Sequence, residues 1–567
     1  MSFRPKAQLH THDVTNQPPP FEDINTFTSD AALADAIDVN GAAIHTERLE
    51  SFGQKAGSAD VQDWARQANE NPPKLHAFDR YGHRINEVEF HPSYHELMSF
   101  GLSGGVAAAS WNAGSETNGK TNGGHVLHAG LLFLMGQAEA GVTCPMSMTY
   151  AAVPALAAQG GAEQTNPSPS VWADRAMIED YDPRVLPAEM KKCATIGMAM
   201  TEKQGGSDVR ANTTKASQTS DGWRLSGHKW FCSAPMCDAF LTLAHTPEGV
   251  TCFLVPRWTT EGERNDMHIM RLKNKLGDRS NASSEIEYHD AYAELVGEPG
   301  KGVRTIIDMV QHTRLDCVVG SAAGMRIALA NALWHTEHRS AFQKKLIDQP
   351  AMQRVLADLV LESEGATALA FRLARSFDKM KSDDAEASYM RLATPIAKYW
   401  ICKRQPGHVY ESLECHGGAG FVEESPMPRY FRASPLNAIW EGSGNVIALD
   451  VLRAVSRSPQ TLEAAVAEVI KFRGRNTSYD AHAKRLMGWL EPGALNEGTA
   501  RAFAEDMGLS LAAAAIADSA DNAGAPDFVF DGFCAARLDP EVRGFGYGAS
   551  DAIVDERSLV SRASPLH

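Results

Sequence analysis

The stretch Ile439-Trp440-Glu441-Gly442-Ser443-Gly444-Asn445 places one carboxylate between an apolar Ile-Trp pair and a glycine-rich turn. A carboxylate on a pliable backbone and beside an aromatic ring is suited to act as a general base at the mouth of a cleft. Burial next to Trp440 would raise the pKa of Glu441, because desolvation disfavours the charged form. The alternative is the first turn of a helix, with an acidic residue near the positive end of the helix dipole.

The composition is that of a large protein with three or four domains. The chain has 567 residues, 43% of them hydrophobic, and a formal charge of −16, so its overall charge does not favour nucleic acid as a partner. Its nine cysteines show no C-x-x-C spacing, which predicts reduced core thiols and no metal site. Neither a signal segment nor an apolar run of roughly 18 residues is evident. We expect a cytoplasmic protein with no membrane partner.

Periodicity divides the chain into parts. A polar, Pro-rich segment predicts an extended arm over residues 1–27 that crosses another surface, which suggests an oligomer. Helical spacing predicts an α-helical domain over 28–195, and helical patterns return over 301–456 and 457–567. Short Thr-, Val- and Trp-containing runs between turns predict a β domain over 196–300, with a strand, a turn and a strand in 222–231 and further strands at 240–244 and 251–255.

Two motifs suggest other functions that their context disfavours. The residues Gly114 to Thr121 match the phosphate-binding G-x-x-x-x-G-K-[ST] pattern, but Asn122-Gly123-Gly124 follows where a helix should begin. We interpret this segment as a surface loop. His335 and His338 are only three residues apart and no third ligand is evident, so a helix surface is favoured over a metal site.

The stretch Met200-Thr201-Glu202-Lys203-Gln204-Gly205-Gly206-Ser207-Asp208 puts two hydroxyl groups around a Gly-Gly turn at the entrance to the β domain. Donors on such a turn suit the edge of a planar heteroaromatic ring. The alternative is a loop whose hydroxyls bond within the loop.

With this stretch, the chain resembles the acyl-CoA dehydrogenase family of flavoproteins. Met200 to Asp208 resembles the M-T-E-x-x-x-G-S-D signature, and Gly227 to Ser233 resembles the strand beside the flavin. Arg339-Ser340-Ala341-Phe342 resembles the R-x-x-F helix that reaches the dinucleotide of a neighbouring subunit. Gly417 to Phe421 and Ile439 to Ser443 complete the series in the family's order. Three features resemble the branch linked to the adaptive response to DNA alkylation: the arm, the extra C-terminal domain, and Glu202-Lys203-Gln204-Gly205-Gly206 in place of a Pro-Gly-containing loop.

The resemblance implies a mainly α fold with a helical N-terminal domain, a middle β-barrel or sandwich, a C-terminal four-helix bundle over 301–456 and an extra helical domain over 457–567. It implies FAD as cofactor and a homotetramer. The residues implied in FAD binding are Met200, Thr201, Gly206, Ser207, Trp230, Phe231, Cys232, Ser233, Arg339, Phe342, Gly418, Trp440, Gly442, Ser443 and Asn445.

The resemblance also implies a reaction. In the family a carboxylate removes the α-proton of an acyl-CoA thioester while a hydride leaves the β-carbon, and Glu441 matches that base. Some branches place the base immediately before an arginine on an earlier helix. Here Thr313 precedes Arg314, which leaves Glu441 as the single candidate. Glu414, where relatives have Gln, and Ala433, where Asp is usual, depart from the pattern at the adenine end of the FAD site.

Two functions follow from this resemblance. One is a metabolic short- or branched-chain acyl-CoA dehydrogenase that passes electrons to an electron-transferring flavoprotein or to oxygen. The other is a flavoprotein of the alkylation response, with weak dehydrogenation and double-stranded DNA bound by residues 457–567. From residue 456 onward 11 Lys and Arg stand against 16 Asp and Glu. A local basic cluster consists of Lys471, Arg473, Arg475, Lys484 and Arg485, although a solvated face explains it equally well.

Overall fold

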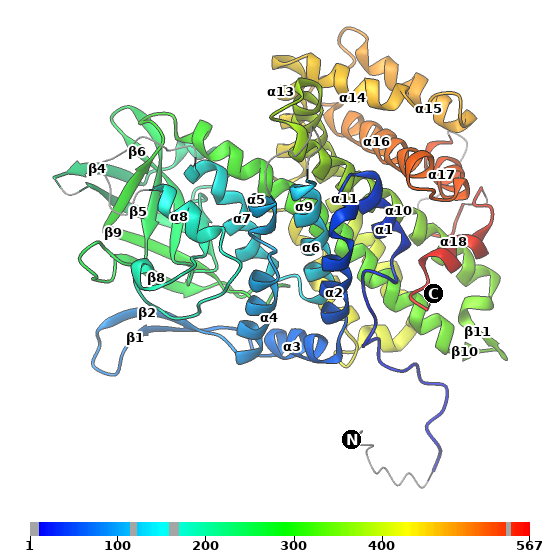
Figure 1. Ribbon diagram of the computed structural model, residues 1–567, viewed down its shortest axis with the longest axis horizontal. Helices are drawn as coiled ribbons and strands as arrows, with labels where there is room; N and C mark the ends of the chain where they lie inside the picture. Colours follow the sequence, from blue (N-terminus) through cyan, green and yellow to red (C-terminus); the bar gives the residue numbers. More distant parts are fainter. Residues whose placement is uncertain are drawn as a thin grey trace.

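In chain order, a middle β domain separates two helical parts, and Figure 1 shows all three. The computed structural model describes residues 11–113, 122–157, 169–220, 222–539, 546–550 and 552–566, so the segment 114–121 lies outside the described residues. The sheet lies at one end of the molecule and the C-terminal helices lie at the other.

The N-terminal part is helical, as predicted, and also contains an unpredicted β-hairpin. Its helices are α1 (Ala31–Val39), α2 (Thr46–Ala56), α3 (Ala59–Glu70), α4 (Pro92–Ser103), α5 (Ala109–Asn112), α6 (Gly124–Ala138), α7 (Thr143–Ala157) and α8 (Pro169–Ala176). Strands β1 (Lys74–Phe78) and β2 (Arg84–Glu89) pair antiparallel. In this hairpin Phe78 is 53% exposed and Val88 is buried, so its apolar pattern is too weak to signal strands in the sequence.

The middle domain is a sheet that closes on itself. Its strands are β3 (Ile196–Ala199), β4 (Lys215–Thr219), β5 (Gly222–Ser233), β6 (Ala239–Thr246), β7 (Gly249–Pro256), β8 (Met267–Leu272) and β9 (Ser283–Val296). The order β3-β6-β4-β5-β9-β7 is closed by pairing of β7 with β6, and β8 pairs with β9. The prediction of a turn within 222–231 is wrong, because β5 continues from Gly222 to Ser233 with only a shift of register against β9 between Leu225 and Ser226.

A bundle of long helices follows the sheet. It contains α9 (Gly302–His338), α10 (Pro350–Lys379), α11 (Asp384–Glu414) and α13 (Gly444–Arg457), with the short α12 (Met427–Ala433) beside them. Among the described residues, α9 is long and apolar enough to cross a membrane by length and composition, but 83% of its apolar window is buried inside the protein. That burial is typical of the central helix of a packed core.

The C-terminal helices share the core of the bundle. They are α14 (Gln460–Ile470), α15 (Thr477–Met487), α16 (Ala500–Asn522), α17 (Asp527–Phe533) and α18 (Glu556–Ala563). Phe503, Met507 and Phe533 belong to the same buried cluster as Trp400 of α11 and Phe371 of α10. The extra segment is therefore packed onto the bundle as a further layer.

The N-terminal arm lies on its own chain. Asn16 exchanges hydrogen bonds with the backbone of Ser340 (2.8 and 2.7 Å), and the indole of Trp334 donates to Pro19 O (2.8 Å). These contacts hold the described part of the arm against the end of α9. The described part of the arm has no helix or strand.

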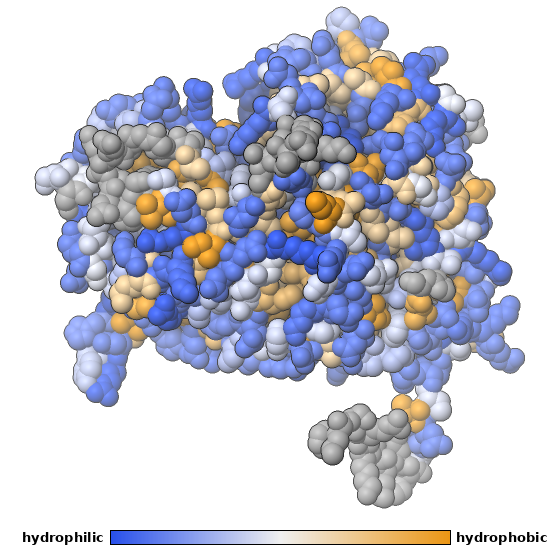
Figure 2. Space-filling model, in the orientation of Figure 1, coloured by the Kyte–Doolittle hydropathy of each residue, from blue (hydrophilic) through white to orange (hydrophobic). Residues whose placement is uncertain are grey.

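The surface carries the polar residues that the acidic composition implies. Figure 2 shows a largely hydrophilic face, with hydrophobic residues in scattered spots. All nine cysteines are buried and free, as predicted.

Candidate functional site

Glu441 lies in a strained turn just before α13. Its φ is +55°, a left-handed conformation that is costly for a residue with a side chain, and Gly442 follows with φ +105°. The Thr313 hydroxyl of α9 donates to Glu441 Oε2 at 3.0 Å. Burial raises the pKa of Glu441, while Thr313, Arg314 and Lys398 oppose the increase. The carboxyl group is therefore held in one direction and biased toward proton uptake.

A buried lysine fixes the loop that carries this carboxylate. Lys398 of α11 is 2% exposed, and its ammonium group donates to the carbonyls of Asn437, Trp440 and Gly442, each at 2.9 Å. The indole of Trp440 donates to Asn437 Oδ1 at 2.8 Å, so the aromatic ring is also held from within the loop.

An ion-pair chain supports the loop from the other side. Arg314 Nε donates to the carbonyl of Glu441 (3.2 Å), and its Nη1 pairs with Asp450 of α13 (2.7 Å). Asp450 also pairs with Arg391 of α11 at 3.0 Å. Lys398, Asp450 and Arg391 were not predicted from the sequence. The one local signal for Lys398 is its place as a lone charge in the apolar run 396–401.

The loop of Met200 to Asp208 is anchored by a buried ion pair. Glu202 and Lys229 are both fully buried and lie 2.9 Å apart. Burial alone would raise the pKa of Glu202, but the Thr213 N–H and Lys229 hold it well below its usual range. A Cβ on Gly206 would lie 2.3 Å from Thr201 Oγ1, so this turn requires glycine. Thr201 therefore lies close to the turn and is half-buried, and Ser207, the residue after Gly206, is exposed.

A bulge in β5 gives residues 230–233, which were predicted to bind FAD, different degrees of burial. The register against β9 shifts between Lys229 and Cys232, and both of these side chains point into the core. Phe231 is 51% exposed, and Trp230 lies beneath the ammonium group of Lys273 (3.3 Å to the ring centre). The buried side chain of Cys232 does not face a surface site, so only its backbone can contribute there.

The N-terminal end of α7 lies near the loop that carries Glu441, residues 437–442, here called the base loop. Thr143 of α7 and Trp440 of this loop line one cavity. Burial raises the pKa of Cys144, the next residue of α7, to about 12, and its interaction with the Ser233 side chain lowers it. The end of β5 and the base loop therefore approach the same end of α7.

The polar groups around this site fit a dinucleotide with a flat apolar ring. Phe231 offers a half-exposed aromatic face, and α13 begins at Gly444 with its N–H groups directed at the loop. The side chains of Lys403 and Arg501 lie 3.6 and 3.2 Å from the position of a Cβ on Gly444, which suits a phosphate group. Ser443, the N-cap of α13, and Asn445 are exposed beside them. Gly418 faces open space.

Arg339 and Phe342 lie on a hairpin, which corrects the prediction of a helix. Helix α9 ends at His338, and β10 (Ser340–Ala341) pairs with β11 (Lys344–Lys345). Phe342 and Gln343 form the turn with φ +52° and +65°, and Phe342 is 94% exposed. Arg339 donates to Asn16 O at 2.7 Å. Within one chain these residues are remote from the base loop.

The two histidines of the earlier alternative make other contacts. The ring of His335 packs on His416 at 4.6 Å, and His338 bonds to Trp334 O at 2.8 Å. In the described ranges, no group of three or more His, Cys, Asp or Glu side chains is placed to hold a metal ion.

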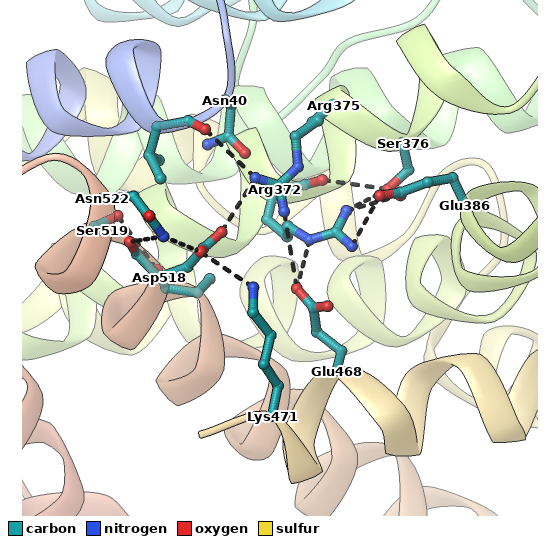
Figure 3. Close-up of polar contacts among 12 residues, drawn as sticks. Asn40, Arg372, Arg375, Ser376, Glu386, Glu468, Lys471, Asp518, Ser519 and Asn522 are labelled. Atoms are coloured by element: carbon teal, nitrogen blue, oxygen red, sulfur yellow. Dashed lines mark hydrogen bonds and ion pairs between the residues drawn. The ribbon is translucent and has the colours of Figure 1, made fainter. Parts of the chain in front are cut away.

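The basic cluster of the C-terminal segment is largely neutralised. Lys471 joins an ionic network with Asp518, Arg375, Glu468 and Arg372 that ties α14 and α16 to α10 (Figure 3). Arg475 pairs with Asp521 and Asp527, each at 2.8 Å, and Arg485 pairs with Asp506 at 3.2 Å. Arg473 and Lys484 are exposed, so these two are the members best placed to meet a phosphate.

Comparison with known proteins defines the class. The model for the acyl-CoA dehydrogenase middle domain matches residues 197–291, and the model for the C-terminal domain of the same family matches 300–456. The model for the adaptive response protein AidB N-terminal domain matches 16–183. The chain belongs to the acyl-CoA dehydrogenase family.

Individual relatives place the chain within that family. It is 43% identical over 478 residues to "Putative acyl-CoA dehydrogenase AidB" of Escherichia coli (strain K12), covering 84% of this chain and 86% of that protein. The structure of Caenorhabditis elegans ACDH-11 in complex with C11-CoA superposes with a TM-score of 0.84 at 26% identity, covering 99% and 97% of the two chains. A Bacillus anthracis acyl-CoA dehydrogenase complexed with FAD shares the fold (TM-score 0.66, 16% identity, 89% of each chain).

These findings confirm the predicted family, its fold, and an oxidoreductase with FAD as cofactor. The contacts of individual residues with FAD stay predictions.

The lysine beneath the base loop gives a test of the site's construction. Lys398→Met removes the donor shared by three carbonyls, so we expect the amides of residues 441–445 to exchange with deuterium at least about tenfold faster, equivalent to one lost bond of about 1.4 kcal/mol. The matched control is Lys379→Met in α10, where the side chain is partly exposed. Equal exchange of this loop in Lys398→Met and the native protein would show that the lysine does not hold it.

Proposed function

We propose that this protein is an FAD-dependent acyl-CoA dehydrogenase in which Glu441 removes the α-proton of the thioester. The observation that carries the proposal is the buried carboxylate of Glu441, oriented by the Thr313 hydroxyl and carried on a loop whose Trp440 lines one cavity with Thr143 of α7. The E. coli relative carries the name "Putative acyl-CoA dehydrogenase AidB", and the ACDH-11 structure is a complex with C11-CoA.

The residues divide the reaction between them. Glu441 accepts the proton as the Cα–H bond breaks, and the electron pair of that bond forms the Cα–Cβ double bond as a hydride leaves Cβ. Bound FAD supplies the two-electron acceptor for that hydride. Thr313 keeps one carboxylate oxygen occupied, which directs the other toward the substrate. Lys398 and Arg314 keep the loop from moving as charge develops. An electron-transferring flavoprotein or oxygen would then accept the electrons.

Removal of the base tests this assignment. Glu441→Gln should slow the anaerobic bleaching of the flavin by butyryl- and isovaleryl-CoA by about 10²–10⁴-fold, the usual contribution of a general base, while the flavin stays bound. Stopped-flow absorbance measures the rate, and Glu424→Gln on the exposed loop before α12 is the matched control. An unchanged rate in Glu441→Gln would remove Glu441 as the base.

The pKa of the base gives a second test. The Thr313 hydroxyl stabilises the charged carboxylate, so Thr313→Val should raise the already raised pKa of Glu441 further. Because only the deprotonated form accepts a proton, the acidic limb of the pH profile of flavin reduction should move to higher pH. Thr336→Val, a buried threonine on the same helix that bonds to Ala332 O, should leave the limb in place. A limb that stays fixed or moves to lower pH in Thr313→Val would contradict the proposed contact.

We propose assembly into a homotetramer. Exposed apolar side chains gather on α11, α12 and the adjoining segments: Tyr410 (50% exposed), Phe421 (83%), Val422 (46%), Phe431 (41%) and Ile439 (62%). Together with Phe342 they offer apolar surface that a second chain would cover.

Phe421→Asp should lower the mass measured by light scattering after gel filtration, because a charge would be buried at the interface. Leu490→Asp, 47% exposed on the C-terminal segment, is the control. A tetramer of unchanged mass in Phe421→Asp would exclude this surface.

We further propose a link to the DNA alkylation response, which the match to the AidB N-terminal model supports. The alternative is a metabolic dehydrogenase with no DNA role. If Arg473 and Lys484 carry the phosphate contacts, the full-length protein should bind a 30-base-pair duplex with a log–log salt slope of about −2, since each contact contributes about −0.9. Fluorescence anisotropy measures this slope. The double variant Arg473→Glu, Lys484→Glu should lose binding, and absence of binding by the native protein at about 50 mM salt would favour the alternative.

A further inference from the structure

The hairpin β10–β11 has a turn that its own sequence disfavours. Its two turn residues, Phe342 and Gln343, both have positive φ (+52° and +65°), in a type of turn that usually carries Asn, Asp or Gly. For a bulky residue such as phenylalanine this backbone conformation is rare and costly. Each strand has only two residues, Ser340–Ala341 and Lys344–Lys345. Because even a longer two-stranded hairpin is marginal on its own, contacts from outside must stabilise this one.

The N-terminal arm supplies such contacts. The side-chain amide nitrogen of Asn16 donates to Ser340 O at 2.8 Å, and Ser340 N donates to Asn16 Oδ1 at 2.7 Å. A residue of a neighbouring antiparallel strand makes the same pair of bonds with its backbone. The Asn16 side chain therefore takes the place of a third strand beside β10. Its own backbone is left-handed (φ +57°), a conformation in which asparagine is several-fold enriched.

The same arm residue also holds the arginine at the base of the hairpin. Arg339 Nη1 donates to Asn16 O at 2.7 Å. This contact fixes the guanidinium through a neutral carbonyl group. In the part of the chain that the structure describes, no carboxylate pairs with Arg339. The charge of Arg339 is therefore held in place and stays available to a group on another molecule.

A second set of contacts anchors the arm itself. The indole of Trp334, near the C-terminal end of α9, donates to Pro19 O at 2.8 Å, and the ring of Phe21 meets the indole edge-on with the ring centres 5.6 Å apart. The three prolines 18–20 restrict the backbone between this anchor and Asn16. Figure 1 shows the arm, in blue, leaving the body of the molecule near β10 and β11. Asn16 thus reaches the hairpin from a fixed point on α9.

We propose that the arm is a brace that holds β10–β11 in the conformation that meets a second copy of this chain, with Asn16 as the positioning residue. Phe342, 94% exposed at the tip, would enter that contact, and Arg339 would face an anionic group held by the second copy. The brace lowers the cost of association, because the strained turn is already ordered before the two copies meet. This inference rests on the homotetramer proposed above.

Hydrogen exchange of the full-length, flavin-loaded protein tests the brace itself. Asn16→Gly keeps the left-handed backbone and removes both side-chain hydrogen bonds. We expect the amides of residues 340–345 to exchange with deuterium at least about tenfold faster than in the native protein. The matched control is Val14→Gly, at an arm position that is 68% exposed, which should leave this exchange unchanged. Native-like exchange of the hairpin in Asn16→Gly would overturn the brace.

Sedimentation over a series of protein concentrations tests the role of the second copy. Asn16→Gly should raise the concentration at which the oligomer half-dissociates by at least about tenfold, because the unbraced hairpin must be ordered on association. If Asn16 acts through the hairpin, the same substitution should have little further effect in Phe342→Ser, where the contact at the tip is already lost.

Two results of the sedimentation series count against the proposal. One is an unchanged midpoint in Asn16→Gly, and the other is an equal effect of Asn16→Gly with and without Phe342→Ser. A native protein that is monomeric at every concentration would instead contradict the tetramer on which the proposal rests.

Discussion

One buried ammonium group holds the candidate site together. Lys398 lies within a helix of the core, where an unpaired charge would cost several kcal/mol. Its three partners are carbonyl oxygens of the same short loop, so the charge is satisfied only when residues 437–442 adopt the observed path. That path includes the left-handed backbone at Glu441, which costs of order 1–3 kcal/mol by itself. The hydrogen bonds that Lys398 makes to this path therefore offset the strain of the turn.

A buried ion pair also supports a loop in the sheet and in the bundle. Glu202 and Lys229 bury opposite charges beneath the Met200 to Asp208 loop, and Arg314 and Asp450 do so beneath the base loop. Each pair is anchored on a regular element and supports an irregular one. Irregular backbone carries the groups that would meet a ligand, while strands and helices hold the charges that fix it.

The sequence predicted the elements with strong local signals and missed those without them. Helix α1 (Ala31–Val39) lies in the domain predicted to be helical, because its apolar spacing is a local signal, and the Asp30 side chain caps it. The hairpin β1–β2 is local but has too weak an apolar pattern to signal strands, and the bulge at 230–231 depends on pairing with the distant strand β9. Glu441 was found because its motif is contiguous. Lys398, Asp450 and Arg391 are residues whose role exists only once three helices are packed, and a motif cannot contain them.

The contact between Thr313 and Glu441 has an evolutionary consequence. Thr313 occupies the helix position that matches the base of some branches of the family, and its hydroxyl lies 3.0 Å from the carboxylate that we propose as the base. Side chains at positions 313 and 441 thus reach the same point in space, one from a helix and one from a loop. A lineage could therefore transfer the base between helix and loop through two substitutions, with each intermediate keeping an oxygen at that point and with no rearrangement of the backbone. The chemistry would then depend on where the reacting group lies in space, and its place in the chain would be free to change.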